Sequence, residues 1–338
     1  MPQFKYFVGV DIASATFVSC IRTSVLEVIA EPKEFSNHEN GYVSFLSWLE
    51  KHTNAVSEIA ICMENTGVYS EGLAYFLAAT NHAVAVEPPL KIQKKFPISG
   101  DKNDPKDSLN IAEYACRYVD KLSFWQPRNE ILEQIKLLLT TRQQLIVQST
   151  AHKNALHAVN RKEVYNQIAK KVHQDMIRGI TIHIKAIDTE IRDLINSIPT
   201  FKQSVLLLDS IPGIGITLAS HLLIMTQNSL DPRKLSAYLG IAPYQHRSGT
   251  SVFKKDTSRH YGPAAARGLL YLAACSVSTH REQFKKYFLR KTAEGKPGKL
   301  VLNNIQNKLI KIACAVLRTQ KPYIPNYVSV NPTCLRKA

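Results

Sequence analysis

Four carboxylates in the first third of the chain have the types and the order of a divalent-metal site. Asp11 stands in the apolar stretch YFVGVDIA, Glu64 closes the apolar run AICM, and Asp104 and Asp107 stand three residues apart in KNDPKDS. A carboxylate inside an apolar strand is costly to bury unless it is paired or bound to a metal, and residues three apart share one face of a helix. If the four acids converge, their mutual repulsion requires cations between them, and Mg²⁺ or Mn²⁺ prefers such oxygen ligands.

The chemistry of such a site is phosphodiester cleavage. Two divalent ions held about 3.5–4 Å apart activate a nucleophile and stabilise the leaving oxygen. Asp104 has a second, compatible interpretation, because an Asp at the N-cap followed by Pro105 is a common helix start. The apolar spacing that follows predicts a helix over about 105–119, so Asp104 is a cap, a metal ligand or both.

The charge of the chain indicates a polyanionic partner. Its 338 residues include 43 Lys and Arg against 27 Asp and Glu, a formal net charge of +16. Between residues 251 and 299, eleven Lys or Arg stand against three acids, so this segment carries half of the excess. Nucleic acid is the first expectation for such a protein, and an anionic membrane surface is the second.

Other features of the composition limit the class of protein. No apolar run reaches the roughly 18–20 residues of a membrane helix, and the N-terminus lacks the pattern of a signal peptide. The six cysteines lie far apart without a C-x-x-C pair, which excludes an ordinary zinc knuckle and is typical of a reducing compartment. We therefore expect a soluble, intracellular protein of the cytoplasm that binds no membrane.

Strand and helix signals alternate over residues 1–120. The runs YFVGVDIA and TFVSCIRT have the pattern of adjacent strands, EIAICMEN of a third strand and HAVAVEP of a fourth. Between the last two, TGVYSEGLAYFLAAT has helical spacing, and Thr66 is a candidate cap. Two adjacent strands followed by strand, helix, strand and helix predict an α/β domain with a mixed sheet.

Residues 121–200 predict two long helices with coiled-coil-like packing. Isoleucine and leucine recur at alternating spacings of three and four from Ile177 to Ile198, over about three heptads. A weaker seam from Leu132 to Ile146 is interrupted by Arg142. The two helices either pack on each other within one chain or pair between chains, and the sequence alone leaves both open.

Residues 201–330 predict a third, mainly α-helical domain. The stretch LLLDSIPGIGITLASHLLIMT has the pattern of a helix, a tight turn and a second helix. Gly213 and Gly215 in this turn leave backbone N–H groups at a helix start, an arrangement that receives a phosphate well. The turn resembles a helix-hairpin-helix motif, which holds DNA backbones without reading sequence; a plain helical turn is the alternative.

The acidic blocks together resemble a known family. The strand with Asp11, MENTG with Glu64, and KNDPKDS with Asp104 and Asp107 are similar to the Asp-Glu-Asp-Asp set of the RuvC-like nuclease domain in the IS110 family of insertion-sequence transposases. That family usually shows Lys-Thr-Asp-x-x-Asp-Ala at the third block, where this chain has Asn for the Thr and Ser for the Ala. The resemblance implies an RNase H-like fold for residues 1–120 and four catalytic acids that bind Mg²⁺ or Mn²⁺.

The stretch LSAYLGIAPYQHRSGTSVFKKDTSRHYGPAAARGLLYLAA resembles the C-terminal transposase domain of the same family. The matching marks are Leu-Gly-apolar-x-Pro at 239–243, Ser248-Gly249, Gly262 and Arg267. The resemblance identifies Ser248 as a nucleophile that forms a covalent phosphoserine link to DNA, with Ser251 and Ser258 as alternatives if the alignment shifts. The residues expected to hold nucleic acid are Gly213, Gly215, His246, Arg247, Lys254, Lys255, Arg259, Arg267, Lys285 and Lys286.

The resemblance further implies a DNA transposase or recombinase guided by a structured bridge RNA that pairs with donor and target DNA. It implies a homodimer or homotetramer in which the nuclease-like domain of one subunit acts with the serine of another. Two other accounts fit the residues: a metal-dependent nuclease or junction resolvase that needs the four acids but no serine, and a nucleic-acid-binding scaffold whose acids are structural caps. The base for the serine, a metal-bound hydroxide or a nearby Asp, stays open.

Overall fold

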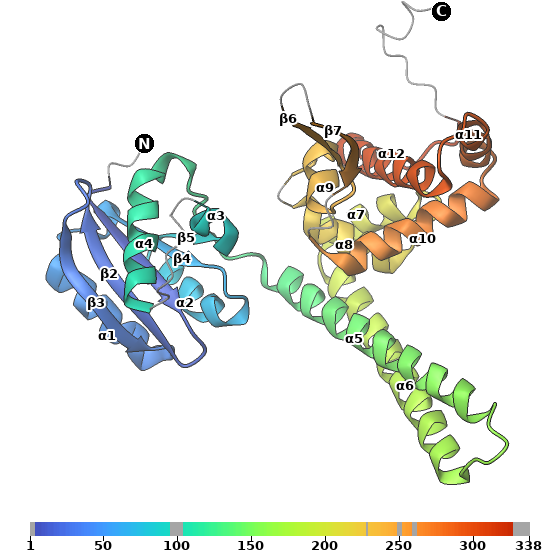
Figure 1. The fold of residues 1–338 in the computed structure, drawn as a ribbon, viewed down its shortest axis with the longest axis horizontal. Helices are drawn as coiled ribbons and strands as arrows, with labels where there is room; N and C mark the ends of the chain where they lie inside the picture. The colour runs from blue at the N-terminus through green and yellow to red at the C-terminus, as the bar shows by residue number, and fades with distance from the viewer. Residues whose placement is uncertain (1–3, 95–103, 228, 249–251, 259–261, 327–338) are drawn as a thin grey trace, which may run out of the picture. The chain divides into compact units, whose positions relative to one another are not determined.

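The structure is a computed structural model that describes residues 4–94, 104–227, 229–248, 252–258 and 262–326. Contacts divide the chain into two compact units, residues 1–128 and 129–338, whose elements are labelled in Figure 1. Within the described ranges, no helix is long and apolar enough to cross a membrane. Ser251 and Arg259 of the predicted site lie outside the described residues.

The strands of the first unit form one mixed sheet in the order β3-β2-β1-β4-β5. Their bounds are Tyr6–Ile12 (β1), Thr16–Thr23 (β2), Val28–Ser36 (β3), Ile59–Glu64 (β4) and Ala83–Glu87 (β5). β1, β2 and β3 are antiparallel neighbours, whereas β4 is parallel to β1 and β5 is parallel to β4. This sheet confirms the predicted α/β class and the predicted mixture of strand directions.

Helices cover both faces of this sheet. Their bounds are Glu39–His52 (α1), Val68–Ala79 (α2), Pro89–Gln93 (α3) and Asp104–Arg117 (α4), with 3₁₀ turns at Val56–Glu58 and Val119–Lys121. On the face of α1 and α2, the rings of Phe17, Phe35 and Phe45 contact one another with centroids 5.3–5.4 Å apart. α4 covers the other face, as Figure 1 shows, and its Ile111 and Tyr114 belong to the core on that side.

Helix α4 lies directly against β1 because Gly9 has no side chain. A Cβ atom at Gly9 would overlap the backbone carbonyl oxygen of Ser108 and the backbone nitrogen of Ala112. At the other end of the helix, the Cys116 thiol lies 3.5 Å from the carbonyl oxygen of Ser24, beside the start of β1. The helix therefore runs antiparallel to β1, with its first turn at the carboxyl end of that strand.

The start of α2 differs from the sequence expectation. The predicted cap at Thr66 is wrong, because the helix begins after Gly67, which has a φ of 69°. The Asn65 side-chain oxygen accepts a hydrogen bond from the Gly67 N–H at 3.1 Å. The chain leaves β4 through a turn that needs positive φ, and glycine adopts this conformation at little cost, so glycine takes the N-cap position.

The second unit begins with a helical hairpin made of α5 (Glu130–Val159) and α6 (Gln167–Ser197). Each helix starts at an asparagine, Asn129 or Asn166, whose side-chain oxygen accepts two backbone N–H bonds of the first turn. The helices pack on each other within one chain, and Ile180 and Ile191 of the predicted seam are buried. Of the two packings that the sequence leaves open, the structure contains the intrachain hairpin.

The remaining elements of the second unit are mainly helical and share one core. Their bounds are Pro199–Asp209 (α7), Ile216–Thr226 (α8), Pro232–Tyr238 (α9), Pro243–Ser248 (β6), Val252–Ser258 (β7), Ala264–His280 (α10), Glu282–Ala293 (α11) and Gly298–Thr319 (α12). Leu132 and Ile135 of α5 and Ile195 of α6 belong to this core, together with Leu208 of α7 and Leu309 of α12. The helical hairpin is therefore anchored at its base in the helical unit.

An ion pair joins α5 to α6 where the predicted seam is interrupted. The Arg142 guanidinium donates to the Asp188 carboxylate through Nε at 2.6 Å and through Nη2 at 3.3 Å, and the two side chains are only 18% and 24% exposed. His221 of α8 lies near Arg142. Burial, and then the positive charge of Arg142, lower the pKa of the His221 imidazole to about 4.

Replacing Gly9 with alanine should destabilise the first unit. The new methyl group meets backbone atoms, which yield less easily than side chains, so we expect a loss of about 3 kcal/mol in the free energy of unfolding, at the upper end for overpacking. Urea unfolding measures the loss. Gly179→Ala is the matched control, because no atom lies within 4 Å of a Cβ there; an equal loss in both variants would contradict the packing described for α4.

The stability of the second unit should fall as the pH is lowered from about 6.5 to about 4. The His221 pKa of about 4 lies below its ordinary value of 6.5, so in this window the unfolded chain binds a proton that the folded chain excludes. The loss should be at most roughly 3 kcal/mol and should level off below pH 4. Urea unfolding of wild type and His221→Gln across this range tests it, with the exposed His157→Gln as control; parallel curves for wild type and His221→Gln would refute the assignment.

Candidate active site

Asp11 and Glu64 lie at the same level of the sheet on neighbouring strands. The last pair of the parallel β1–β4 ladder is Val10 with Met63, and Asp11 and Glu64 are the next residues of the two strands. Side chains alternate between the two faces of a sheet, so residues two or four apart on one strand share a face. Phe7 is four residues from Asp11, Cys62 is two residues from Glu64, and both Phe7 and Cys62 face α4. Asp11 and Glu64 therefore point to the α4 face, and both are half-buried.

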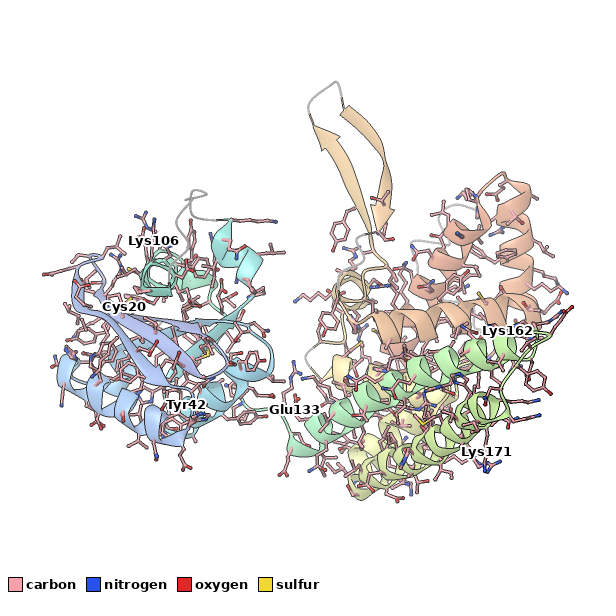
Figure 2. The ribbon with its side chains drawn as sticks, turned by 60° about the horizontal axis from the view of Figure 1, so that its bottom comes forward. Cys20, Tyr42, Lys106, Glu133, Lys162 and Lys171 are labelled. Atoms are coloured by element: carbon pink, nitrogen blue, oxygen red, sulfur yellow. The ribbon has the colours of Figure 1, made fainter. Side chains whose placement is uncertain are left out.

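The first turn of α4 brings a third acid to this end of the sheet. Asp107 is half-buried, and the next residue, Ser108, donates its hydroxyl to the Pro105 carbonyl at 2.8 Å. Lys106 of the same turn is exposed and is labelled in Figure 2. Asp104 is the first residue of α4, and its side chain lies outside the described residues. The positive end of the helix dipole offsets part of the repulsion among these carboxylates.

A further acid, Glu87, lies beside Glu64 on the adjacent strand and is not among the predicted residues. Glu87 pairs with Glu64 in the β4–β5 ladder and is 2% exposed. Its Oε2 accepts a hydrogen bond from Lys91 Nζ at 2.7 Å, and its Oε1 accepts one from the Ser123 N–H at 3.4 Å. The sequence signal was available, because Glu87 closes an apolar run just as Glu64 does.

The donor set at this end of the sheet fits a hard divalent cation. Asp11, Glu64 and Asp107 offer carboxylate oxygens, the ligands that Mg²⁺ and Mn²⁺ prefer. Among the described side chains, no group of three His, Cys, Asp or Glu already stands at metal-binding distances, and the side chain of Asp104 is not part of that comparison. The arrangement gathers hard ligands from two parallel strands and one helix.

The predicted nucleophile lies on a β-hairpin of the second unit. Ser248 is the last residue of β6 and pairs with Val252 of β7, while His246 pairs with Lys254. The alternative Ser258 pairs with Pro243 at the opposite end of the ladder. Ser248 therefore stands at the tip of the hairpin, and Ser258 stands at its base.

The base of this β-hairpin is fixed to the helical core by several polar contacts. Gly262 has a φ of 86°, and a Cβ atom there would overlap the carbonyl oxygen of Tyr238. Arg267 Nη1 donates to the Leu239 carbonyl at 3.2 Å. Two asparagines of α12, Asn303 and Asn307, both donate to the Ile241 carbonyl, at 3.0 and 3.2 Å. Arg267, predicted to bind nucleic acid, thus also holds the end of α9.

Comparison with known proteins gives the family. Residues 8–161 match a family model of the DEDD type described as "Transposase", and residues 205–289 match one described as "Transposase IS116/IS110/IS902 family". The chain is 30% identical over 326 residues to the pilin gene-inverting protein of Moraxella lacunata, a match that covers 94% of this chain and 98% of that protein. The chain belongs to the IS110 family of transposases. The pilin gene-inverting protein of Moraxella bovis matches with the same identity and coverage.

Membership of the IS110 family makes this chain a DNA-rearranging enzyme that binds DNA. The first matched segment spans the sheet and the acids around α4, and the mixed sheet with its helices is consistent with a RuvC-like fold. The second segment spans the β-hairpin with Ser248. A DEDD-type transposase domain indicates a requirement for a divalent metal.

The other predicted DNA contacts of this IS110 transposase lie on the helical unit. A Cβ atom at Gly213 would press on Val277, 2.9 Å away, so this glycine lets the turn pack closely on α10, whereas the space around Gly215 at the N-cap of α8 is open. Lys285 is exposed on α11, and Lys286 forms a surface ion pair with Glu282 at 3.3 Å. The structure thus gives Gly213 a packing role and leaves Gly215 accessible.

Removing the ammonium group of Lys91 should destabilise the first unit. Lys91→Met leaves the buried Glu87 carboxylate without its cation, and because the Lys91 side chain is 40% exposed we expect about 1–3 kcal/mol rather than the full cost of a deeply buried pair. Urea unfolding measures the change, and the exposed Lys94→Met serves as control. The double variant Lys91→Met/Glu87→Gln should recover at least half of the loss; no recovery would show that the pair is not the cause.

Proposed function

We propose that this IS110 transposase cuts and rejoins DNA through a covalent link between Ser248 and a DNA phosphate, assisted by a divalent-metal site at Asp11, Glu64, Asp104 and Asp107. The observation that supports the proposal is that β1, β4 and the first turn of α4, which bear Asp11, Glu64 and Asp107, lie at the same end of the sheet. Bound Mg²⁺ or Mn²⁺ would supply the stabilisation of charge on the phosphate oxygens.

The serine reaction is a balanced exchange of phosphodiester bonds. The Ser248 Oγ forms a bond to the scissile phosphorus and loses its proton, while the bond from phosphorus to the leaving deoxyribose oxygen breaks and that oxygen takes up a proton. A strand hydroxyl attacking the phosphoserine reverses the step and releases the serine. One phosphodiester replaces another, so no nucleotide cofactor is needed.

Cationic residues around Ser248 support this chemistry. His246, Arg247, Lys254 and Lys255 belong to the same β-hairpin, and cations at this point hold a phosphate and offset the charge that develops on it. Further phosphate contacts are proposed for Arg259, Arg267, Gly213, Gly215, Lys285 and Lys286. We also propose, from the family resemblance, a homodimer or homotetramer and a bridge RNA that pairs with donor and target DNA.

A hydrolytic nuclease or junction resolvase is the alternative. It is favoured by the fact that the acids lie in a unit with its own hydrophobic core, so that cleavage by water needs no residue of the second unit. In that case Ser248 has no covalent role, and DNA ends would be released free.

Covalent capture of DNA distinguishes these functions. We expect that the protein, incubated with Mg²⁺, the RNA encoded beside the gene and a duplex carrying the end junction of the element, forms a protein–DNA adduct that maps to Ser248. Ser248→Ala should abolish the adduct, and Asp11→Asn or chelation of Mg²⁺ should reduce it by at least 100-fold. Denaturing electrophoresis and mass spectrometry of the digested adduct give the readout.

Ser258→Ala is the matched control, because this serine lies on the same hairpin at its base. It should leave the adduct unchanged. Free cleaved ends without any adduct, lost in Asp11→Asn but not in Ser248→Ala, would establish the hydrolytic function instead. An adduct that persists in Ser248→Ala would contradict the assignment of Ser248 as the nucleophile.

A further inference from the structure

Positive charge is concentrated in the free half of the α5–α6 hairpin. Between residues 153 and 178 the chain has six Lys or Arg and two acids. The basic residues are Lys153, Arg161, Lys162, Lys170, Lys171 and Arg178. Five of them are exposed, and Lys170 is half-buried. Figure 2 shows Lys162 and Lys171 toward the end of the hairpin that is remote from the helical core.

The half of the hairpin nearest the core has a different charge pattern. Residues 130–147 carry two basic and two acidic residues, and residues 179–197 carry two basic and three acidic residues. The two signs of charge are nearly balanced there, and some form ion pairs, such as Glu133 with Lys136 at 2.9 Å and Arg142 with Asp188 at 2.6 Å. A solvated helical hairpin needs only such mixed charge, so the excess in the free half is not required for the hairpin to fold.

Little of the excess in the free half is neutralised by neighbouring acids. Among the described residues of this half, an ion pair joins Arg178 to Asp175 at 3.6 Å. The two side chains are 78% and 51% exposed, and such an exposed pair is weak. The connecting turn between the helices is also exposed, with Val164 at 89% and Tyr165 at 49%. The end of the hairpin is thus an uncompensated cationic surface.

We infer that the free end of the α5–α6 hairpin binds the backbone of duplex DNA outside the strand-exchange site. The inference rests on the DNA-rearranging function of the family and does not depend on the serine chemistry. Six cations spread over two packed helices and their connecting turn fit the regular phosphates of a duplex, which lysine and arginine neutralise without reading bases.

Duplex DNA fits this surface better than a single-stranded nucleic acid does. Single strands bind by stacking their bases on aromatic side chains, and between residues 153 and 178 the chain contains one Tyr and no Phe or Trp. The ring of that residue, Tyr165, is partly covered by Lys170, whose Nζ lies 5.9 Å from the ring centroid. The surface therefore offers charge and little stacking area.

The length of the hairpin sets how far this contact lies from the core. α5 has 30 residues, and a rise of about 1.5 Å per residue makes it about 45 Å long. One turn of duplex DNA is about 34–36 Å. A contact at the free end therefore adds about one helical turn to the length of DNA that the protein covers.

Salt-dependent binding to plain duplex DNA tests the inference without any cleavage. We expect Lys162→Ala/Lys171→Ala to reduce the slope of log K against log salt concentration by about two, the value for two lost phosphate contacts. Hydroxyl-radical footprinting of the same complexes should lose protection over about one turn at one end. Fluorescence anisotropy with a 60-base-pair duplex of arbitrary sequence, in the absence of Mg²⁺, gives the slope.

The control changes two exposed basic residues of α6 nearer the core, Lys185→Ala/Arg192→Ala, and should leave both slope and footprint unchanged. Lys162→Arg/Lys171→Arg should retain the wild-type slope, and equal circular dichroism spectra exclude unfolding of the hairpin. An unchanged slope in Lys162→Ala/Lys171→Ala would overturn the inference. So would a loss of binding confined to a structured RNA of the same charge, or to anionic vesicles, with duplex binding intact.

Discussion

The packing of α4 on β1 is the constraint on which the rest of the first unit depends. A glycine at position 9 allows the helix backbone to touch the strand backbone at Ser108 and Ala112. This contact fixes both the height and the direction of α4, and so places its first turn at the carboxyl end of β1 and β4. The acids of the candidate site come from three separate elements, and one close backbone contact sets their register.

In the second unit, two projecting hairpins are positioned by contacts at their bases. The α5–α6 hairpin begins in the helical core and is tied across by Arg142 and Asp188. The β6–β7 hairpin is held at its base by Arg267, Asn303 and Asn307, which donate to carbonyl groups between α9 and β6. In both cases a well-packed base supports a cationic segment, which suits a protein whose substrate is a large polyanion.

Much of the fold follows from local patterns in the sequence, and the rest depends on contacts between distant residues. The strands around Asp11 and Glu64, the helix after Asp104 and the isoleucine seam of α6 have strong periodicity. β3 and α1 were missed because β3 holds charged residues and a proline, as edge strands tolerate, and α1 is amphipathic with polar ends. Thr66 was mistaken for a cap because the positive φ of Gly67 is not visible in a propensity pattern.

The residue types of the candidate site can be predicted from the sequence, but the residues that contact and position them cannot. Single positions such as Asp11 could be named because an acid in an apolar strand is anomalous by itself. The role of Glu87 depends on its pairing with Glu64 across the β4–β5 ladder, and strand register is a non-local property. The anchoring by Asn303 and Asn307 joins segments more than 60 residues apart, which no local pattern reveals.

The seating of α4 on β1 also has a consequence for biosynthesis. β1 leaves the ribosome about 100 residues before α4, the helix that covers one of its faces. At a translation rate of roughly 5–20 residues per second, α4 is synthesised about 5–20 seconds after β1. A nascent chain that has not yet reached α4 therefore exposes the apolar side chains of this face of the sheet, such as Phe7 and Cys62.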